Sequence, residues 1–166
     1  LIEKPDIVIF EDYNKGILTQ NIIEQTIEIC IKSNIPTSVD PKRKNFFSYK
    51  NVTLFKPNLH EVFTSLNILP GKVSGDTLSD MHEQLKEKLG HKISMITLSE
   101  KGIFYQEGTD KNILPSHRRN IADVSGAGDT VIAVASLVYA STKNIYLAAE
   151  IANIAGGIVG EEVGKA

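Results

Sequence analysis

The segment that most restricts the fold is KISMITLS, residues 92–99, a run with apolar side chains on both of its faces. Such a strand is typical of the centre of a parallel sheet, where helices cover both faces. Shorter apolar runs at 6–12, 37–42 and 51–58 are predicted to be further strands. Helical patterns alternate with these strands. The alternation predicts an α/β fold of three layers, with a mainly parallel sheet between two layers of helices.

Helices are predicted where apolar residues recur at helical spacing. Thr19 is expected to cap the first helix and Asn58 the second, and Gly90 is expected to end the third. Residues 102–115 have the pattern of a hairpin with Gly108 in its turn. The helices are expected at residues 20–34, 59–67, 77–89, 127–140 and 145–159.

Composition restricts the class of protein. The 166 residues suffice for one domain with a sizeable core, and a formal net charge of -2 gives no reason to expect nucleic acid as a partner. No apolar stretch approaches the roughly 20 residues that span a bilayer, and the start lacks the pattern of a signal peptide. The single cysteine, Cys30, excludes an internal disulfide and is expected to be a buried thiol. A cytoplasmic protein without nucleic-acid or membrane partners is predicted.

Polar residues follow several of the predicted strands directly. In open α/β sheets, ligands bind beyond the carboxyl ends of the strands, so these residues are expected at one edge. They combine carboxylates, lysines, an amide and glycines, which suits phosphates together with a hydrated divalent cation. The segments concerned are 12–16, 40–42, 56–61 and 99–102.

The glycine-rich segment 121–134, IADVSGAGDTVIAV, predicts an anion site at the start of a helix. Asp129 would repel a permanently bound anion there. A phosphoryl group in transfer explains the combination, because backbone amides stabilise its developing charge and Asp129 accepts the proton of the attacking hydroxyl. The alternative is an ordinary helix start in which Asp129 only favours the helix dipole. The segment does not fit a dinucleotide fingerprint, since Val131 replaces its last glycine, and the nearest approach to a P-loop, PGKVSG, has Val73 in place of Ser or Thr.

Four motifs occur in order along the chain: KPNLHE at 56–61, TLSEKG at 97–102, DVSGAGDT at 123–130 and AEIANIAGGIVGEEVG at 149–164. Together they resemble the motifs of the ribokinase-like (PfkB) carbohydrate kinases. Within this family, DYNKG at 12–16 and VDPK at 39–42 are most similar to the D-glycero-β-D-manno-heptose 7-phosphate kinases of lipopolysaccharide precursor synthesis. Those kinases usually have glycine at the position of Asn14.

The resemblance implies phosphoryl transfer from ATP, with magnesium, to a sugar hydroxyl. By matching position, Asp129 is the implied catalytic base, and Gly126, Ala127 and Gly128 are the implied anion hole. Glu61 is implied to hold magnesium through water. The implied contacts of ATP and its phosphates are Asn58, Glu61, Thr97, Ser99, Gly102, Asn153, Lys15 and Lys42. The implied ligands of a monovalent cation such as K⁺ are Asp123, Ser125, Glu162 and Gly164.

Several of these residues also have purely structural explanations. Asn58 is a plausible helix cap, Glu61 a solvated first-turn acid, and Lys15 and Lys42 ordinary turn lysines. Asn153 lies in an apolar helix, where its amide needs either a protein partner or a ligand.

The family's N-terminal portion, with its sugar-recognising acids and lid, has no counterpart in these residues. Residues 1–166 are therefore predicted to be the C-terminal, nucleotide-binding portion of such a kinase domain. The predicted acceptor is the anomeric hydroxyl of the heptose 7-phosphate. The alternatives are a fructose phosphate, ribose or nucleoside kinase, and a non-catalytic nucleotide-binding domain. An exposed sheet edge at 6–12 is expected to be covered by the missing portion or by a second copy.

Overall fold

The structure, a computed structural model, describes residues 3–116 and 126–161. Strands β1 to β4 of its sheet are parallel to one another, and β5 and β6 are antiparallel to their neighbours. The mainly parallel sheet that the sequence predicts is confirmed. The order β1-β2-β3-β4-β5-β6 runs through β1 (Val8–Glu11), β2 (Thr37–Asp40), β3 (Leu54–Phe55), β4 (Ile93–Thr97), β5 (Ile103–Glu107) and β6 (Asp110–Leu114).

Strand β4 lies inside the sheet, as its two apolar faces predict, but its pairing is mixed. It is parallel to β3 and antiparallel to β5. After β4 the chain makes one short 3-10 turn, Ser99–Lys101, and returns at once as β5. A connection this short cannot make the crossover that a parallel neighbour needs. The hairpin therefore makes β5 and β6 antiparallel.

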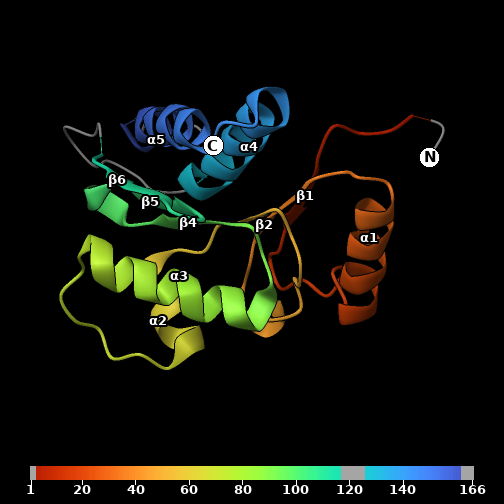
Figure 1. Cartoon of the computed structure of the whole chain (residues 1–166), viewed down its shortest axis with the longest axis horizontal. Coiled ribbons are helices and arrows are strands. Elements are labelled where there is room, and N and C mark those ends of the chain that lie inside the picture. Colours follow the sequence, from red (N-terminus) through yellow and green to blue (C-terminus); the bar gives the residue numbers. More distant parts are fainter. Residues whose placement is uncertain (1–2, 117–125, 162–166) are drawn as a thin grey trace.

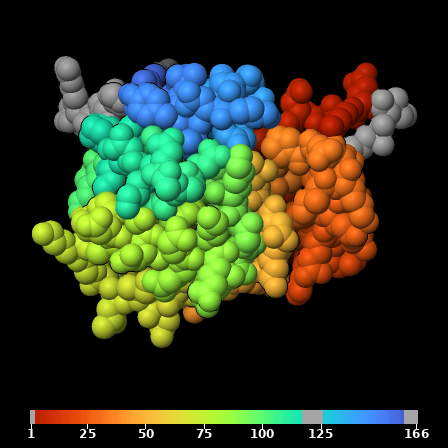
Figure 2. All heavy atoms as spheres, viewed as in Figure 1, coloured from red at the N-terminus to blue at the C-terminus, as the bar shows by residue number. Residues whose placement is uncertain are grey.

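Helices cover both faces of the sheet (Figure 1). On one face lie α1 (Gln20–Lys32), α2 (Leu59–Leu66) and α3 (Gly75–Leu89), and on the other lie α4 (Ala127–Thr142) and α5 (Ile145–Glu161). The space-filling view shows α4 and α5 as a blue layer above the green hairpin strands (Figure 2). A buried contact of 2.6 Å between Ser38 Oγ and Ser136 Oγ holds α4 against β2.

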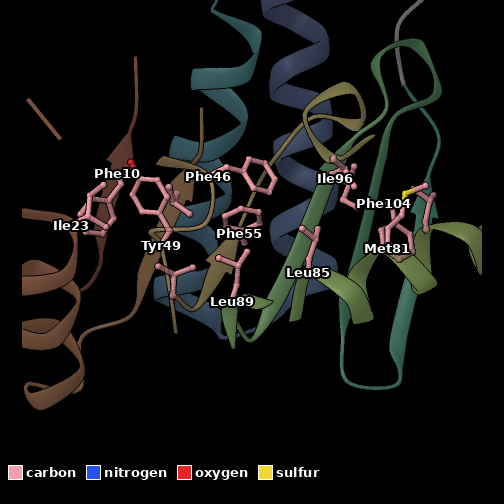
Figure 3. Packing of buried hydrophobic residues seen from close by; sticks show 14 of the residues in the cluster. Phe10, Ile23, Phe46, Tyr49, Phe55, Met81, Leu85, Leu89, Ile96 and Phe104 are labelled. Atoms are coloured by element: carbon pink, nitrogen blue, oxygen red, sulfur yellow. The ribbon is translucent and has the colours of Figure 1, made fainter. Parts of the chain in front are cut away.

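Each face of the sheet has its own apolar core. The core beneath α1, α2 and α3 contains Phe46 and Phe55, whose rings meet edge to face with centroids 5.1 Å apart (Figure 3). Such edge-to-face contacts are favourable beyond the burial of the rings alone. Cys30 is a buried free thiol, as expected. The described residues contain no helix that is long and apolar enough to cross a membrane.

The predicted capping residues are confirmed. Thr19 Oγ1 accepts from Ile22 N at 3.4 Å, and Gly90 ends α3 with φ 65°. Strand β3 is shorter than predicted, because Pro57 has no amide hydrogen for a sheet ladder and Asn58, which keeps only an isolated bridge to Thr97, caps the next helix. Strand β1 pairs only with β2 and is an edge of the described sheet, as expected.

Candidate functional site

The tip of helix α4 lies against the carboxyl ends of the strands. A Cβ atom added to Gly128 would be 3.8 Å from Lys56 Nζ and 3.9 Å from Asp40 Oδ2. Gly126 caps the helix with φ 76°, and the first amides of any helix lack an intrahelical acceptor. The structure thus brings the glycine-rich turn and the polar strand ends together, as predicted.

A chain of ion pairs runs along this edge of the sheet. Lys56 Nζ lies 3.1 Å from Asp40 Oδ1, and Lys42 Nζ lies 3.2 Å from both Asp40 Oδ1 and Glu61 Oε1. Burial opposes the charge of Lys42 most strongly, but the carboxylates of Asp40 and Glu61 outweigh it and raise the pKa of the ammonium. Lys42 is therefore held as a cation between two acids.

Asn58 and Glu61 form a capping box at the start of α2. Asn58 Oδ1 accepts from Glu61 N at 2.8 Å, and Glu61 Oε2 accepts from Asn58 N at 2.8 Å. The structural explanation of Asn58 as a helix cap is therefore confirmed, and it fixes both side chains at the sheet edge. The described residues contain no cluster of three or more metal-ligating side chains. This arrangement does not fit a magnesium ion caged by protein, but it fits one that keeps water and phosphate oxygens as most of its ligands.

A cleft of about 730 Å³ opens between α2, the 3-10 turn, the start of β5, the first turns of α4 and the second half of α5, and we call it the α4 cleft. The predicted site residues that line it are Asn58, Thr97, Ser99, Gly102, Ala127, Gly128 and Asn153. The side-chain amide of Asn153 donates to the carbonyl of Pro115 at 2.8 Å, so it has the protein partner that burial requires. The structure thus brings these seven residues together at one cleft, while Glu61, Lys15 and Lys42 are not among its lining residues.

Gly102 shapes one wall of the α4 cleft. Its φ is 97°, and a Cβ atom there would lie 1.9 Å from the carbonyl oxygen of Leu114. No side chain fits, since the backbone of the hairpin and the turn after β4 are in direct contact at this point. Glycine is therefore required here for the shape of the cleft.

Asp129 lies on the side of α4 that faces the loop after β1. Tyr13 of that loop donates a hydrogen bond of 2.8 Å to Asp129 Oδ2. A second hollow of about 650 Å³, the loop cavity, is lined by Glu11, Asp12, Tyr13 and Lys15 among others. Burial, and then the negative charges of Asp129 and Asp40, raise the pKa of Glu11. The α4 tip therefore stands between two cavities, with Gly128 in the wall of one and Asp129 in contact with the wall of the other.

The loop after β1 is built on Asp12. This buried carboxylate accepts hydrogen bonds from Tyr49 Oη at 2.8 Å, Asn45 Nδ2 at 2.9 Å and the amide of Asn14 at 2.8 Å. Asn14 has a left-handed φ of 54°, a conformation that asparagine adopts more readily than most residues other than glycine. This explains how asparagine can stand where the similar kinases usually have glycine.

The remaining predicted residues divide into two groups. Lys15 is exposed and lines the loop cavity, whereas Lys42 is engaged by two acids. The residues assigned to a monovalent-cation site lie outside the described residues; these are Asp123, Ser125, Glu162 and Gly164.

Sequence analysis did not single out Lys56 or Tyr13. Lys56 is 2% exposed, which is unusual for lysine. Its position directly after an apolar strand is the sequence feature that could have marked it as a site residue. Tyr13 contacts Asp129 across 116 residues of sequence, and no local pattern predicts such a contact.

Known proteins with similar sequences cover nearly all of the chain. The sequence profile of the pfkB family carbohydrate kinase matches residues 1–166. Bifunctional protein HldE of Campylobacter concisus is 37% identical over 161 residues, which are 96% of this chain and 33% of that protein. Bifunctional protein HldE of Aliarcobacter butzleri is 37% identical over 166 residues, which are 99% of this chain and 34% of that protein. The chain thus spans about a third of the length of these relatives.

Solved structures share the fold. Phosphofructokinase-2 of Escherichia coli in complex with potassium has a TM-score of 0.83 at 17% identity, over 95% of this chain and 52% of that chain. Ribokinase of Arabidopsis thaliana complexed with ribose and ATP has a TM-score of 0.81 at 19% identity, over 96% of this chain and 51% of that chain. The predicted ribokinase-like α/β/α fold is confirmed.

Proposed function

Because the chain belongs to the pfkB family of carbohydrate kinases, we propose that it is the nucleotide-binding part of an ATP-dependent sugar kinase. The observation that carries the proposal is the placement of the α4 tip. Gly128 lines the α4 cleft on one side, while Asp129 contacts the wall of the loop cavity on the other. A phosphoryl donor in the first cavity and an acceptor hydroxyl near the second would meet at this tip.

The α4 cleft is the proposed site of ATP. Thr97, Ser99 and Gly102 would lie along the nucleotide, and Asn153 near its adenosine end. Magnesium would be held by phosphate oxygens and water, with Glu61 as the acid that would hold those waters. A monovalent cation such as K⁺ remains a further proposal; a solved structure of Escherichia coli phosphofructokinase-2 contains potassium.

In the proposed reaction, the acceptor hydroxyl attacks the γ-phosphorus of ATP. Its oxygen forms the new bond to phosphorus, its proton passes to the carboxylate of Asp129, and the bond to the bridging oxygen of ADP breaks. The amides of Gly126, Ala127 and Gly128 would receive the charge that develops on the phosphoryl oxygens. The buried ammonium of Lys56, next to Gly128, would add a positive charge at the same place.

The proposed acceptor is the anomeric hydroxyl of D-glycero-β-D-manno-heptose 7-phosphate. Support comes from the segments 12–16 and 39–42, which resemble those of the heptose 7-phosphate kinases, and from the HldE relatives at 37% identity. Lys15 lines the loop cavity and not the α4 cleft, so we propose that it binds the sugar's own phosphate in place of the implied phosphate of ATP. The free edge of β1 is the proposed contact with the remainder of the kinase or with a second copy.

The proposal is tested by measuring ADP release with magnesium and ATP against a panel of sugars, using the whole protein that contains this chain. The panel contains the heptose 7-phosphate, fructose 6-phosphate, ribose and a nucleoside. We expect turnover to be fastest with the heptose phosphate. Preference for another sugar would overturn the acceptor assignment. Binding of ATP by calorimetry without turnover on any sugar would favour a non-catalytic nucleotide-binding protein.

A further inference from the structure

One contact at the α4 tip is explained neither by the core nor by the nucleotide cleft: the hydrogen bond of 2.8 Å from Tyr13 Oη to Asp129 Oδ2. We infer that Tyr13 is a positioning residue, whose hydroxyl holds the carboxylate of Asp129 so that its other oxygen faces the acceptor hydroxyl. The inference rests on the proposed function, since it assigns Tyr13 a part in the same transfer.

The exposure of Tyr13 supports this role. Within this chain Tyr13 is 55% exposed, so burial against the described residues contributes little to holding its ring. Its hydroxyl crosses from the loop after β1 to the first turn of α4. Among the described residues, Asp129 accepts this one hydrogen bond, through Oδ2, and Oδ1 is left for another donor. One fixed oxygen and one available oxygen suit a general base.

The loop that carries Tyr13 is itself well anchored. Its neighbour Asp12 is buried and accepts hydrogen bonds from Asn45 and Tyr49, which lie in the segment between β2 and β3. The amide of Asn14 completes a tight turn by donating to Asp12 Oδ1 at 2.8 Å. These contacts fix the backbone on both sides of Tyr13. A fixed backbone allows an exposed side chain to hold a catalytic group at little entropic cost.

The charges around Asp129 explain why its carboxylate needs the hydrogen bond from Tyr13. Glu11 lies close enough to Asp129 that, after burial, the charge of Asp129 is the next largest cause that raises the pKa of Glu11. The same repulsion acts on the carboxylate of Asp129 and would turn it away from Glu11. Lys56 is the nearby cation, but it is paired with Asp40. The hydroxyl of Tyr13 therefore supplies a donor that keeps the Asp129 carboxylate at the loop cavity.

The kinetic test is Tyr13→Phe in the whole protein, with Tyr105→Phe as the matched control. Tyr105 also donates to an aspartate, Asp110 Oδ1 at 3.2 Å, but in the β5–β6 hairpin. We expect Tyr13→Phe to lower kcat about tenfold, the effect of one hydrogen bond to a charged group, while the KM for ATP stays within about twofold of wild type. Tyr105→Phe should leave both parameters unchanged.

The outcomes separate this inference from the proposed function. If the wild-type protein transfers no phosphoryl group to any sugar, the proposed function fails. If wild type is active and Tyr13→Phe keeps full kcat, the positioning role alone is wrong. A rise in the KM for ATP with unchanged kcat would also overturn it, because it would place Tyr13 in nucleotide binding.

A second readout does not depend on activity. The hydrogen bond to Asp129, followed by desolvation and the charge of that acid, raises the pKa of Tyr13. The difference between the ultraviolet titrations of wild type and Tyr13→Phe isolates this phenol from all other tyrosines of the protein. In an Asp129→Ala background, we expect the same difference curve to move down towards the ordinary tyrosine value of about 10. A curve that does not move would show that the two side chains do not interact in solution.

Discussion

Acid should destabilise this protein through a buried histidine pair between α3 and β4. His91 Nε2 lies 2.6 Å and His82 Nδ1 2.8 Å from the same hydroxyl, Ser94 Oγ. The other ring nitrogens, His91 Nδ1 and His82 Nε2, have no hydrogen-bond partner among the described residues. Glu83 Oε1 lies 3.7 Å from His82 Nε2, but a proton added to the His91 ring would be buried without an acceptor, which is costly.

The magnitude follows from His91. Burial, assisted by the neighbouring His82 and Lys86, lowers its pKa to about 3. The unfolded chain has an ordinary histidine pKa of about 6.5 and so takes up a proton at a higher pH than the folded chain. The stability due to neutral His91 is therefore complete above pH 6.5 and is lost progressively as the pH falls towards 3. At about 1.4 kcal/mol per pH unit, the loss at pH 5 is about 2 kcal/mol.

The assay is urea unfolding at pH 7.5 and pH 5.0 of wild type, His91→Gln and His60→Gln. His60 is exposed at the start of α2 and serves as the matched control. The fall in unfolding free energy between the two pH values should be about 2 kcal/mol smaller in His91→Gln than in wild type. His60→Gln should keep the wild-type fall. The reasoning is refuted if His91→Gln and wild type lose the same free energy on acidification.

Two further predictions concern the walls of the site. Gly102→Ala should lower the unfolding free energy by at least about 2 kcal/mol, because Gly102 has a φ of 97° and a Cβ atom there would clash with Leu114. Gly108 also has a positive φ but has open space around it, so Gly108→Ala should lower the unfolding free energy by less in the same urea assay. Lys56→Met should lower kcat on the order of 100-fold by removing a cation beside Gly128. A Lys56→Met enzyme with wild-type kcat and an intact fold by circular dichroism would remove Lys56 from the proposed mechanism.

Local sequence signals predicted most of the fold, since each relies on neighbouring residues. Thr19 and Asn58 were expected as caps and are caps, because the motif requires only a side-chain oxygen and the next turn of helix. Strand β4 was correctly placed inside the sheet. Its antiparallel partner β5 shows that apolar faces report burial and not strand direction.

The sequence also predicted which strand ends meet, because parallel strands deliver their following residues to one edge. Thr97 and Ser99, at the end of β4, line the α4 cleft as that rule requires, and Gly128 reaches the same cleft from the start of α4. The strand-end rule does not predict which charged side chains pair with one another along this edge of the sheet. The contacts of Lys56 with Asp40 and of Tyr13 with Asp129 depend on how α4 packs on the sheet, and only the three-dimensional structure shows them.

The central claim, that the α4 tip transfers a phosphoryl group with Asp129 as the base, is tested most directly by Asp129→Asn in the whole protein. The amide keeps the shape of the side chain and the capacity to accept from Tyr13, but it cannot take up the proton of the acceptor hydroxyl. We predict that kcat falls on the order of 100- to 10,000-fold, while the affinity for ATP with magnesium, measured by calorimetry, is unchanged. Full turnover by the Asp129→Asn protein would contradict the account.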